Sequence, residues 1–185
     1  MKSETKILII EAQAGDANAF HDLVAMFDGK IMTLAYQLTQ NKQDAEDLYQ
    51  EAFIKAYKNI SKFRFQSEFY TWLYRITINT FYNMKRKLSK YHFQEPDIKG
   101  TNDPVSHLSD ESHNPQNAHE IQSAVKNAAQ NLPLKQRTAF MLKHMQNLKI
   151  REIANIMDIG EGTVKKYLFR AMEKLRDELK EYQYA

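Results

Sequence analysis

Apolar residues recur at spacings of three and four along residues 5–90, where no proline is present. Such spacing is typical of amphipathic helices, so the pattern predicts helices throughout this part of the chain. The same spacing returns over residues 118–185, whereas residues 91–117 are rich in Pro, Asn, Ser and His and contain few apolar residues. We therefore expect an all-α fold of two small helical domains, residues 1–90 and 118–185, joined by a flexible linker.

Turn and capping residues indicate where the helices begin and end. Gly15 breaks the first helix, and Asp16 is expected to cap a second helix that starts near Ala17. Gly29 is expected to bend or interrupt that second helix. Further helices are expected at about 42–59, 67–89, 134–145 and 162–179, with a short helix before a tight turn at 158–160.

Acidic residues gather on one side of the helix expected at 42–59. At 100° per residue, Asp44, Asp47 and Glu51 fall within about 60° of one another. One interpretation is a solvated face whose acids lie near the positive end of the helix dipole. The other is a docking surface for a basic partner.

Residues 61–90 mix aromatic, amide and basic side chains, with seven Lys or Arg against one Glu. On a helical wheel, a core stripe is expected at Phe69, Leu73, Ile76, Thr80 and Met84, and an outward face at Thr71, Arg75, Asn79, Tyr82 and Arg86, with Trp72 and Asn83 at its margin. Aromatic rings stack on bases, amides read base edges and cations neutralise phosphates, so this face suits single-stranded nucleic acid. The alternative is that most of the aromatic residues form the core.

The pattern near the C-terminus predicts a helix-turn-helix motif. Its first helix has an apolar side at Leu148, Ile153, Ala154, Met157 and Ile159, and its second buries Val164, Leu168, Ala171 and Leu175. Thr163, Lys166, Phe169 and Arg170 then point outward, with Lys165 at the flank. A recognition helix places such residues in the major groove of duplex DNA.

Composition narrows the possible functions. The formal net charge is only +3, but its distribution is uneven, since the linker carries five acidic residues against Lys99 alone. The chain has no cysteine, which excludes disulfides, thiolate metal sites and thiol catalysis. Four of the six histidines lie in or beside the linker at spacings that fit no helical metal face, so we expect no metal and no cofactor.

Targeting signals are weak. The apolar runs are shorter than the roughly 20 residues needed to span a bilayer, and the N-terminus is a poor signal peptide, so we expect a cytoplasmic protein with no membrane insertion of its own. Along the chain, the acidic side of the helix at 42–59 is followed by the aromatic and basic segment at 61–90, the acidic linker at 91–117 and the helix-turn-helix. This order fits a protein that binds promoter DNA, which has both a melted and a duplex segment. The alternatives are a helix-turn-helix repressor or activator with an unrelated N-terminal domain, and an enzyme.

Three segments resemble a known family. Residues 44–57 (DAEDLYQEAFIKAY) resemble sigma region 2.2, and residues 69–80 (FYTWLYRITINT) resemble regions 2.3 and 2.4. Four short segments resemble region 4: Leu132-Pro133 with Arg137, Glu152–Ala154, Gly162–Lys165 and Phe169–Ala171. The chain is similar to extracytoplasmic-function (ECF) sigma factors of bacterial RNA polymerase, and within them to the sigma-E type, over nearly its whole length except the linker.

This resemblance implies partners and residue roles. The polymerase core would be bound through its β′ clamp coiled coil and β flap, with contacts at Asp44, Asp47, Gln50 and Glu51. The −10 element would be captured and melted by Phe63, Arg64, Ser67, Trp72, Arg75, Asn79, Asn83 and Arg86. The −35 element would be read by Lys143, Thr163, Lys165, Lys166, Phe169 and Arg170. The linker would thread toward the RNA exit path, an anti-sigma factor is implied, and the protein would be nucleoid-associated in the holoenzyme.

The chain departs from the family pattern before the first helix of the turn motif. The family usually has Gly-Leu-Ser-Tyr there, whereas this chain has Asn147-Leu-Lys-Ile150. Asn can replace Gly where φ is positive, so Asn147 is expected in that conformation. Lys149 cannot cap the helix as Ser would, so we expect a frayed helix start.

Overall fold

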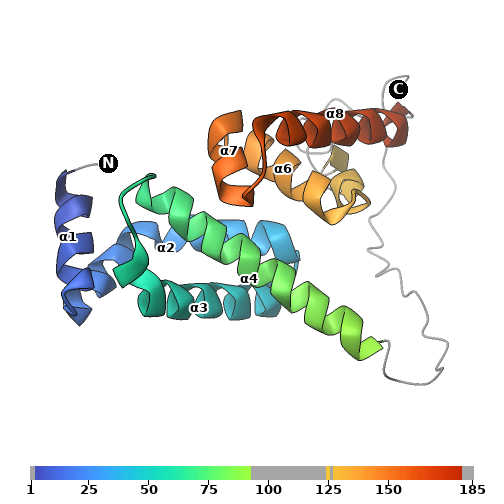
Figure 1. The fold of residues 1–185 in the computed structure, drawn as a ribbon. Helices are drawn as coiled ribbons and strands as arrows, with labels where there is room; N and C mark the ends of the chain where they lie inside the picture. Colours follow the sequence, from blue (N-terminus) through green and yellow to red (C-terminus); the bar gives the residue numbers. More distant parts are fainter. Residues whose placement is uncertain (1–2, 93–123, 126, 181–185) are drawn as a thin grey trace.

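The computed structural model describes residues 3–92, 124–125 and 127–180, and its described elements are all helical. The N-terminal domain contains α1 (Ser3–Gln13), α2 (Ala17–Thr39), α3 (Lys42–Asn59), the 3₁₀ turn η1 (Ile60–Lys62) and α4 (Phe69–His92). The C-terminal domain contains α6 (Leu134–His144), α7 (Ile150–Met157) and α8 (Glu161–Glu178) (Figure 1). This confirms the expected all-α fold with two helical domains. The path expected for the linker lies outside the described residues, apart from the end of α4.

The helix starts follow from the capping residues. The Asp16 carboxylate accepts from the backbone N–H of Asn18 at 2.8 Å, and the Asn41 side-chain oxygen accepts from that of Asp44 at 3.0 Å. Each bond satisfies a donor that the first turn of a helix leaves free. The interruption expected at Gly29 was wrong, because α2 continues through it from Ala17 to Thr39. A single glycine costs a helix only about 1 kcal/mol relative to alanine.

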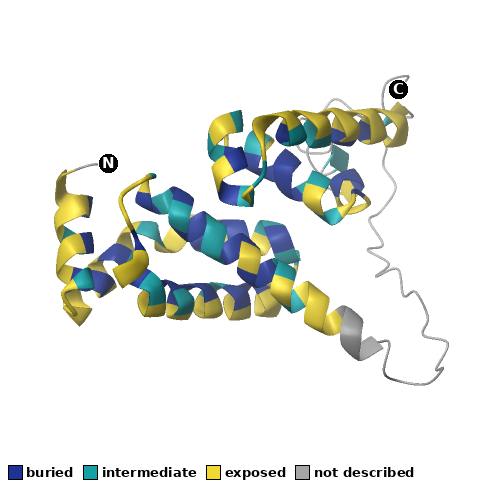
Figure 2. Cartoon of the chain, in the orientation of Figure 1, coloured by how far each residue is buried: buried dark blue, intermediate teal, exposed yellow. Residues whose placement is uncertain are grey.

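The core of the N-terminal domain lies between α2, α3 and α4. Its fully buried side chains include Leu23, Ile31, Leu34 and Leu38 of α2, Leu48 of α3, and Leu73, Ile78 and Phe81 of α4. Burying each such side chain stabilises the fold by roughly 1.5–3 kcal/mol. The outer sides of α3 and α8 stay exposed along their length (Figure 2).

The helix-turn-helix forms as the sequence predicted. Asp158 ends α7 in a left-handed conformation with φ 55°, and the chain turns into α8 at Gly160. Asn147 also has a positive φ, 53°, which confirms that it takes the conformation usual for glycine. The frayed start expected for α7 was wrong, since the Glu152 carboxylate accepts from the Lys149 N–H at 2.8 Å. Glu152 therefore satisfies the Lys149 N–H, which is the half of a capping box that needs no acceptor on the Lys149 side chain.

The two domains pack against each other. Their apolar cluster is continuous, extending from Leu38 and Ile78 in the N-terminal domain to Leu142 and Ile153 in the C-terminal domain. Helix α7 lies against α4 (Figure 1). No helix of residues 3–92, 124–125 and 127–180 has the length and apolarity that crossing a membrane would require.

Candidate nucleic-acid interface

The acidic stripe lies on the outer side of α3. Asp44, Asp47, Gln50 and Glu51 are all exposed. Two large apolar side chains lie along the same helix, Ile54 at 49% exposed and Tyr57 at 52%. Apolar side chains exposed beside a charged rim are typical of protein-binding surfaces. The surface therefore combines acidic and apolar side chains, a composition that is usual for a docking site.

A groove joins this stripe to α4. It has a volume of about 410 Å³ and is lined by Asp47, Gln50, Glu51, Ile54 and Lys55 of α3 and by Thr80, Asn83, Met84 and Lys87 of α4. The Lys55 amine pairs with Glu51 at 3.0 Å and donates to the Thr80 hydroxyl at 3.3 Å. Two groups that the sequence assigned to different partners, the acids of α3 and Asn83 of α4, thus face one groove.

A second hollow forms where the loop after η1 meets the start of α4. Its volume is about 360 Å³, and its lining consists of Lys62, Phe63, Arg64, Gln66, Ser67, Thr71, Trp72, Arg75 and Asn155. The structure thereby brings together five residues that the sequence proposed for −10 recognition: Phe63, Arg64, Ser67, Trp72 and Arg75. The hollow has an aromatic wall and cationic edges.

Phe63 forms the wall of this hollow from inside the core. Its side chain is only 4% exposed, and its ring centroid lies 5.4 Å from that of Trp72 and 5.5 Å from that of Phe69. Phe65, at φ 56°, packs against Phe63 with the ring centroids 5.1 Å apart and the ring planes tilted by 60°. The Gln13 amide of α1 donates to the carbonyls of Ile60 and Phe63 at 3.0 and 2.8 Å, which fixes the backbone that carries the loop.

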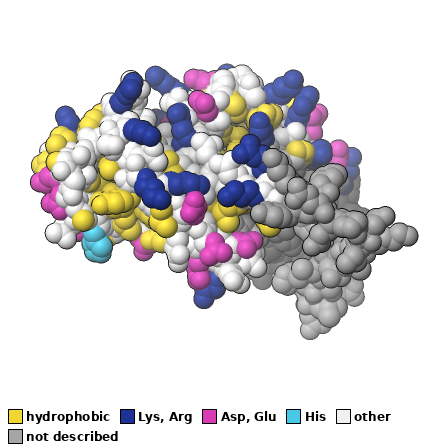
Figure 3. All heavy atoms as spheres, turned by 60° about the horizontal axis from the view of Figure 1, so that its bottom comes forward, with side chains coloured by type: hydrophobic (Ala, Val, Ile, Leu, Met, Phe, Trp, Pro, Cys, Tyr) yellow, Lys and Arg dark blue, Asp and Glu magenta, His cyan; other side chains and the backbone are white. Residues whose placement is uncertain are grey.

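The remaining −10 candidates lie farther along α4. Asn79, Asn83 and Arg86 are exposed and do not line the second hollow. Arg86 donates to the Asn83 side chain at 3.1 Å. Figure 3 shows basic side chains spread in a broken row across one face of the molecule, with acidic side chains grouped beside them. An elongated strand could follow such a row of cations.

The outward face expected for α4 was partly wrong. Thr71 is buried and Tyr82 is half-buried. Arg75 is also half-buried, because its guanidinium Nε donates to the backbone carbonyl of Asn155 at 2.8 Å. The C-terminal domain therefore covers part of the side of α4 that a helical wheel places in solvent.

Two tyrosines of α4 also contact the C-terminal domain. The Tyr70 hydroxyl donates to the Glu152 carboxylate, and the Tyr74 hydroxyl donates to the Gln146 side chain at 2.9 Å. Burial raises the pKa of Tyr74 to about 12, so this hydroxyl stays a hydrogen-bond donor at neutral pH.

The −35 candidates lie mainly on α8. Lys165, Lys166, Phe169 and Arg170 are exposed, Phe169 at 65%, and Thr163 is half-buried. Their spacing puts Thr163, Lys166 and Arg170 on one side of the helix. Lys143 comes from α6, and its amine donates to the Leu148 carbonyl in the loop before α7 at 3.4 Å. An exposed ring among cations on a second helix suits contact with base edges and phosphates.

Sequence reasoning missed several residues of these surfaces. Lys62 directly precedes the loop residues already proposed, so its position in the chain could have indicated it. Ile54 and Tyr57 are apolar residues on the acidic side of α3, and this position could have indicated them. Asn155 carries no sequence signal, because it reaches the second hollow from the other domain.

Comparisons with known proteins agree with this arrangement. The Sigma-70 region 2 model matches residues 23–91, and the Sigma-70 region 4 model matches residues 122–175. The ECF RNA polymerase sigma factor SigW of Bacillus subtilis is 34% identical over 98% of this chain and 100% of its own. The chain belongs to the ECF sigma factors. The ECF sigma-E factor of Escherichia coli is 35% identical to this sigma factor over 92% of this chain and 91% of its own.

Solved structures give the same fold for this sigma factor. The sigma factor RpoE in complex with the anti-sigma factor NepR from Bartonella quintana is 25% identical, with a TM-score of 0.69 over 87% of this chain and 96% of its own. CnrH in complex with the cytosolic domain of CnrY is 21% identical, with a TM-score of 0.67, which supports the fold alone. This ECF sigma factor is a transcription initiation factor that recognises promoters together with core RNA polymerase.

Proposed function

We propose that this sigma factor uses three surfaces to bind core polymerase, the −10 strand and the −35 duplex, and that the first two meet in the groove between α3 and α4. The side of α3 with Asp44, Asp47, Gln50 and Glu51 binds core polymerase. The hollow beside the loop after η1, together with α4, takes the −10 strand. The exposed side of α8 takes the −35 duplex. The observation that carries this proposal is the second hollow, where aromatic and cationic side chains from a loop and a helix converge.

The polymerase contact follows from charge and exposure. The acidic side chains of α3 are exposed toward a basic partner, and Ile54 and Tyr57 supply apolar area beside them. We assign this face to the β′ clamp coiled coil, and the C-terminal domain to the β flap. Charged groups at such a face decide which partner docks and how fast, while the apolar residues supply most of the affinity.

The −10 contact follows from the shape of the hollow. A base that leaves the stack is read by aromatic contacts and by polar groups at its edge. The Phe63–Trp72 wall supplies the apolar surface, and Ser67 supplies a hydroxyl at the rim. Arg64 lies at the edge, where it can meet phosphates, and Asn79, Asn83 and Arg86 continue along α4 to hold the melted strand.

The −35 contact follows from the helix-turn-helix. Helix α8 enters the major groove with Thr163, Lys166, Phe169 and Arg170 toward the bases, and Lys143 and Lys165 contact phosphates. Promoter recognition on this scheme needs no covalent chemistry, so we propose that the protein is not an enzyme. We also propose a cytoplasmic location, with nucleoid association in the holoenzyme.

An anti-sigma factor is a further proposed partner. One similar solved structure is that of the sigma factor RpoE in complex with the anti-sigma factor NepR. We propose that an inhibitor of this kind binds the present chain and blocks its polymerase-binding face.

Run-off transcription tests the proposed function. Core RNA polymerase would be incubated with genomic DNA of the source organism, with and without this protein. We expect new transcripts that start at defined promoters only when the protein is present. The same transcripts with core polymerase alone, or sequence-specific binding to duplex DNA by the isolated protein without polymerase, would favour a helix-turn-helix repressor or activator instead.

A further inference from the structure

Phe65 has a backbone conformation that its residue type rarely adopts. Its φ is 56°, in the left-handed region, and among the described residues Gln40, Asn147 and Asp158 are the other non-glycine residues with a positive φ. Gln40 and Asp158 cap the C-terminal ends of α2 and α7, and Asn147 lies in the turn between α6 and α7, where this conformation is usual. Phe65 is bulky and lies in the connection between η1 and α4, so its conformation is an outlier.

Contacts on both sides hold Phe65 in this conformation. The Gln13 amide donates to the carbonyls of Ile60 and Phe63, just before the loop turns. The Phe65 ring packs against the ring of Phe63, which also contacts the ring of Trp72. Strained residues persist where their surroundings over-determine them, and they cluster at sites that clamp a ligand. The left-handed backbone of Phe65 therefore indicates a functional role for this residue.

The ring of Phe65 is what distinguishes this residue from a glycine. Glycine would adopt the left-handed conformation at no steric cost. The Phe65 residue is 36% exposed, so its contact with Phe63 leaves part of the ring open to solvent. Phe65 does not line the second hollow, whereas its neighbours Arg64 and Gln66 do. The loop therefore presents an aromatic surface directly outside the hollow.

We propose that Phe65 is a second stacking platform for the melted −10 strand, and that it takes the base next to the one held in the second hollow. The proposal rests on the proposed function, because it takes the hollow as the site of the flipped base. One base enters against Phe63 and Trp72, and its neighbour stacks on the Phe65 ring, whose centroid lies 5.1 Å from that of Phe63. Aromatic side chains stack on any base, since every base has a π face.

The charges around Phe65 suit a strand that follows this path. Lys62 and Arg64 are exposed, and both line the hollow. No Asp or Glu of the described residues lines it. Phosphates on either side of a base stacked on Phe65 would therefore meet cations without a competing acid. Stacking and charge act along the same short stretch of strand.

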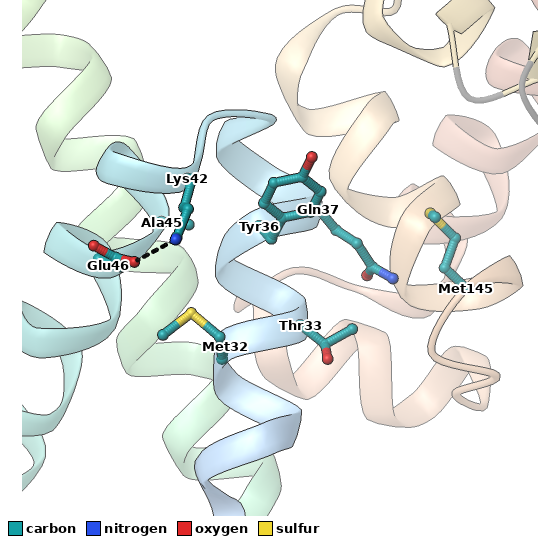
Figure 4. A pocket seen from close by; sticks show the side chains of 8 residues that line it. All are labelled: Met32, Thr33, Tyr36, Gln37, Lys42, Ala45, Glu46 and Met145. Atoms are coloured by element: carbon teal, nitrogen blue, oxygen red, sulfur yellow. Dashed lines mark ion pairs between the residues drawn. The ribbon is translucent and has the colours of Figure 1, made fainter.

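Another exposed ring, that of Tyr36 on α2, provides a matched comparison. Tyr36 is 44% exposed and lines a groove of about 490 Å³ that also contains Met145 of the C-terminal domain. Figure 4 shows the pair between Lys42 and Glu46 in this groove, which joins the two side chains at 4.0 Å. The groove shares no lining residue with the second hollow. Tyr36 is therefore a ring of similar exposure in a place where we expect no strand.

The experiment uses holoenzyme formed from core RNA polymerase and the full chain. The probe is a labelled single-stranded −10 oligonucleotide from a promoter found by run-off transcription, and fluorescence anisotropy measures its binding. In a series of such oligonucleotides, each −10 base is removed in turn, which leaves an abasic sugar. Phe65→Leu keeps an apolar side chain without the ring, and Phe65→Tyr keeps the ring. Affinity for core polymerase checks that each variant is folded.

Phe65→Leu should weaken binding of the intact oligonucleotide at least about fivefold, which is the lower limit for one stacked base. Phe65→Tyr and the control Tyr36→Leu should bind within about twofold of the natural chain. Removal of one particular base should weaken binding by the natural holoenzyme, and Phe65→Leu should cause no further loss on that oligonucleotide. Such coupling at one position identifies the base as the partner of the ring.

Several results would overturn the proposal, and they point to different errors. Unchanged affinity in Phe65→Leu, or an equal loss at every abasic position, would show that the ring contacts no base, and would leave the proposed function standing. An equal loss in Tyr36→Leu would show that the effect does not come from the loop. If no abasic sugar weakens binding by the natural holoenzyme, the hollow does not read a base, and the proposed function of the hollow is wrong together with the role of Phe65.

Discussion

Charge reversal on α3 should abolish binding to core polymerase without unfolding the protein. The double variant Asp47→Lys/Glu51→Lys changes two exposed side chains on the lining of the groove between α3 and α4. It breaks the pair between Glu51 and Lys55 and puts a like charge beside that lysine. Partly exposed pairs of this i,i+4 type contribute about 0.3–0.5 kcal/mol. The free energy of unfolding should therefore fall by about 1 kcal/mol at most.

The effect on binding should be larger. Each substitution replaces an attraction to a basic partner by a repulsion, and juxtaposed like charges cost several kcal/mol at an interface. We expect a loss of at least about 2 kcal/mol in binding free energy, which is about 30-fold in Kd. Affinity for core polymerase would be measured by fluorescence anisotropy, and stability by thermal unfolding.

The matched control is Glu11→Lys/Asp22→Lys. Both residues are exposed on α1 and α2, and the variant has the same net charge as the α3 variant. It should keep its affinity for core polymerase within about twofold. If the α3 variant is folded and still binds core polymerase as the natural chain does, or if the control loses affinity equally, the α3 face is not the polymerase-binding surface.

Four further predictions concern individual residues. Asn79→Ala should impair promoter opening and be partly rescued on a template already mismatched at the −10 element, as permanganate footprinting would show; no rescue would separate Asn79 from strand reading. Arg170→Ala should weaken recruitment by roughly 1–3 kcal/mol if it reads a base, and the mismatched template should not restore this loss. Asp158→Gly should raise the free energy of unfolding by about 0.5–1 kcal/mol, because Asp158 has φ 55° and its carboxylate lies at the negative end of α7; a lower melting temperature would refute this. The hydrogen bond from Tyr70 is the main cause that holds the pKa of Glu152 below its ordinary 4.5. The stability that this carboxylate contributes is therefore complete above pH 4.5 and is lost as the pH falls through the lowered pKa. Glu152→Gln should remove that part of the acid unfolding transition followed by Trp72 fluorescence, and an unchanged transition would count against this account.

The local features of the fold were predictable because their signals are local. Asp16 and Asn41 each cap a helix with an oxygen that reaches two or three residues ahead. The turn at Asp158 and the positive φ of Asn147 follow in the same way from residue type and position. The interruption at Gly29 was wrongly expected, because helix propensity considered alone omits the buried side chains on either side of it, Leu23 and Ile31, that anchor α2 in the core.

The covered side of α4 could not be predicted from its own pattern. Tyr70, Tyr74 and Arg75 find partners 82, 72 and 80 positions away, on α7 and the loop before it. A helical wheel describes one helix and carries no information about which distant segment packs on it. For the same reason the sequence showed the acids of α3 and Asn83 of α4 as separate features, although they line one groove.

The hydrogen bonds from Gln13 have a consequence for how the family is delimited. The region 2 match begins at residue 23, so α1 lies outside it, yet α1 supplies the amide that holds the carbonyls of Ile60 and Phe63. A chimeric sigma factor assembled from the matched segments alone would keep every residue proposed for DNA contact. It would lose the Gln13 hydrogen bonds that hold the backbone of the loop after η1. Its promoter preference would broaden, since the loop could no longer present the hollow in one fixed shape. Modular transplantation of promoter specificity in this family should therefore begin at the first helix.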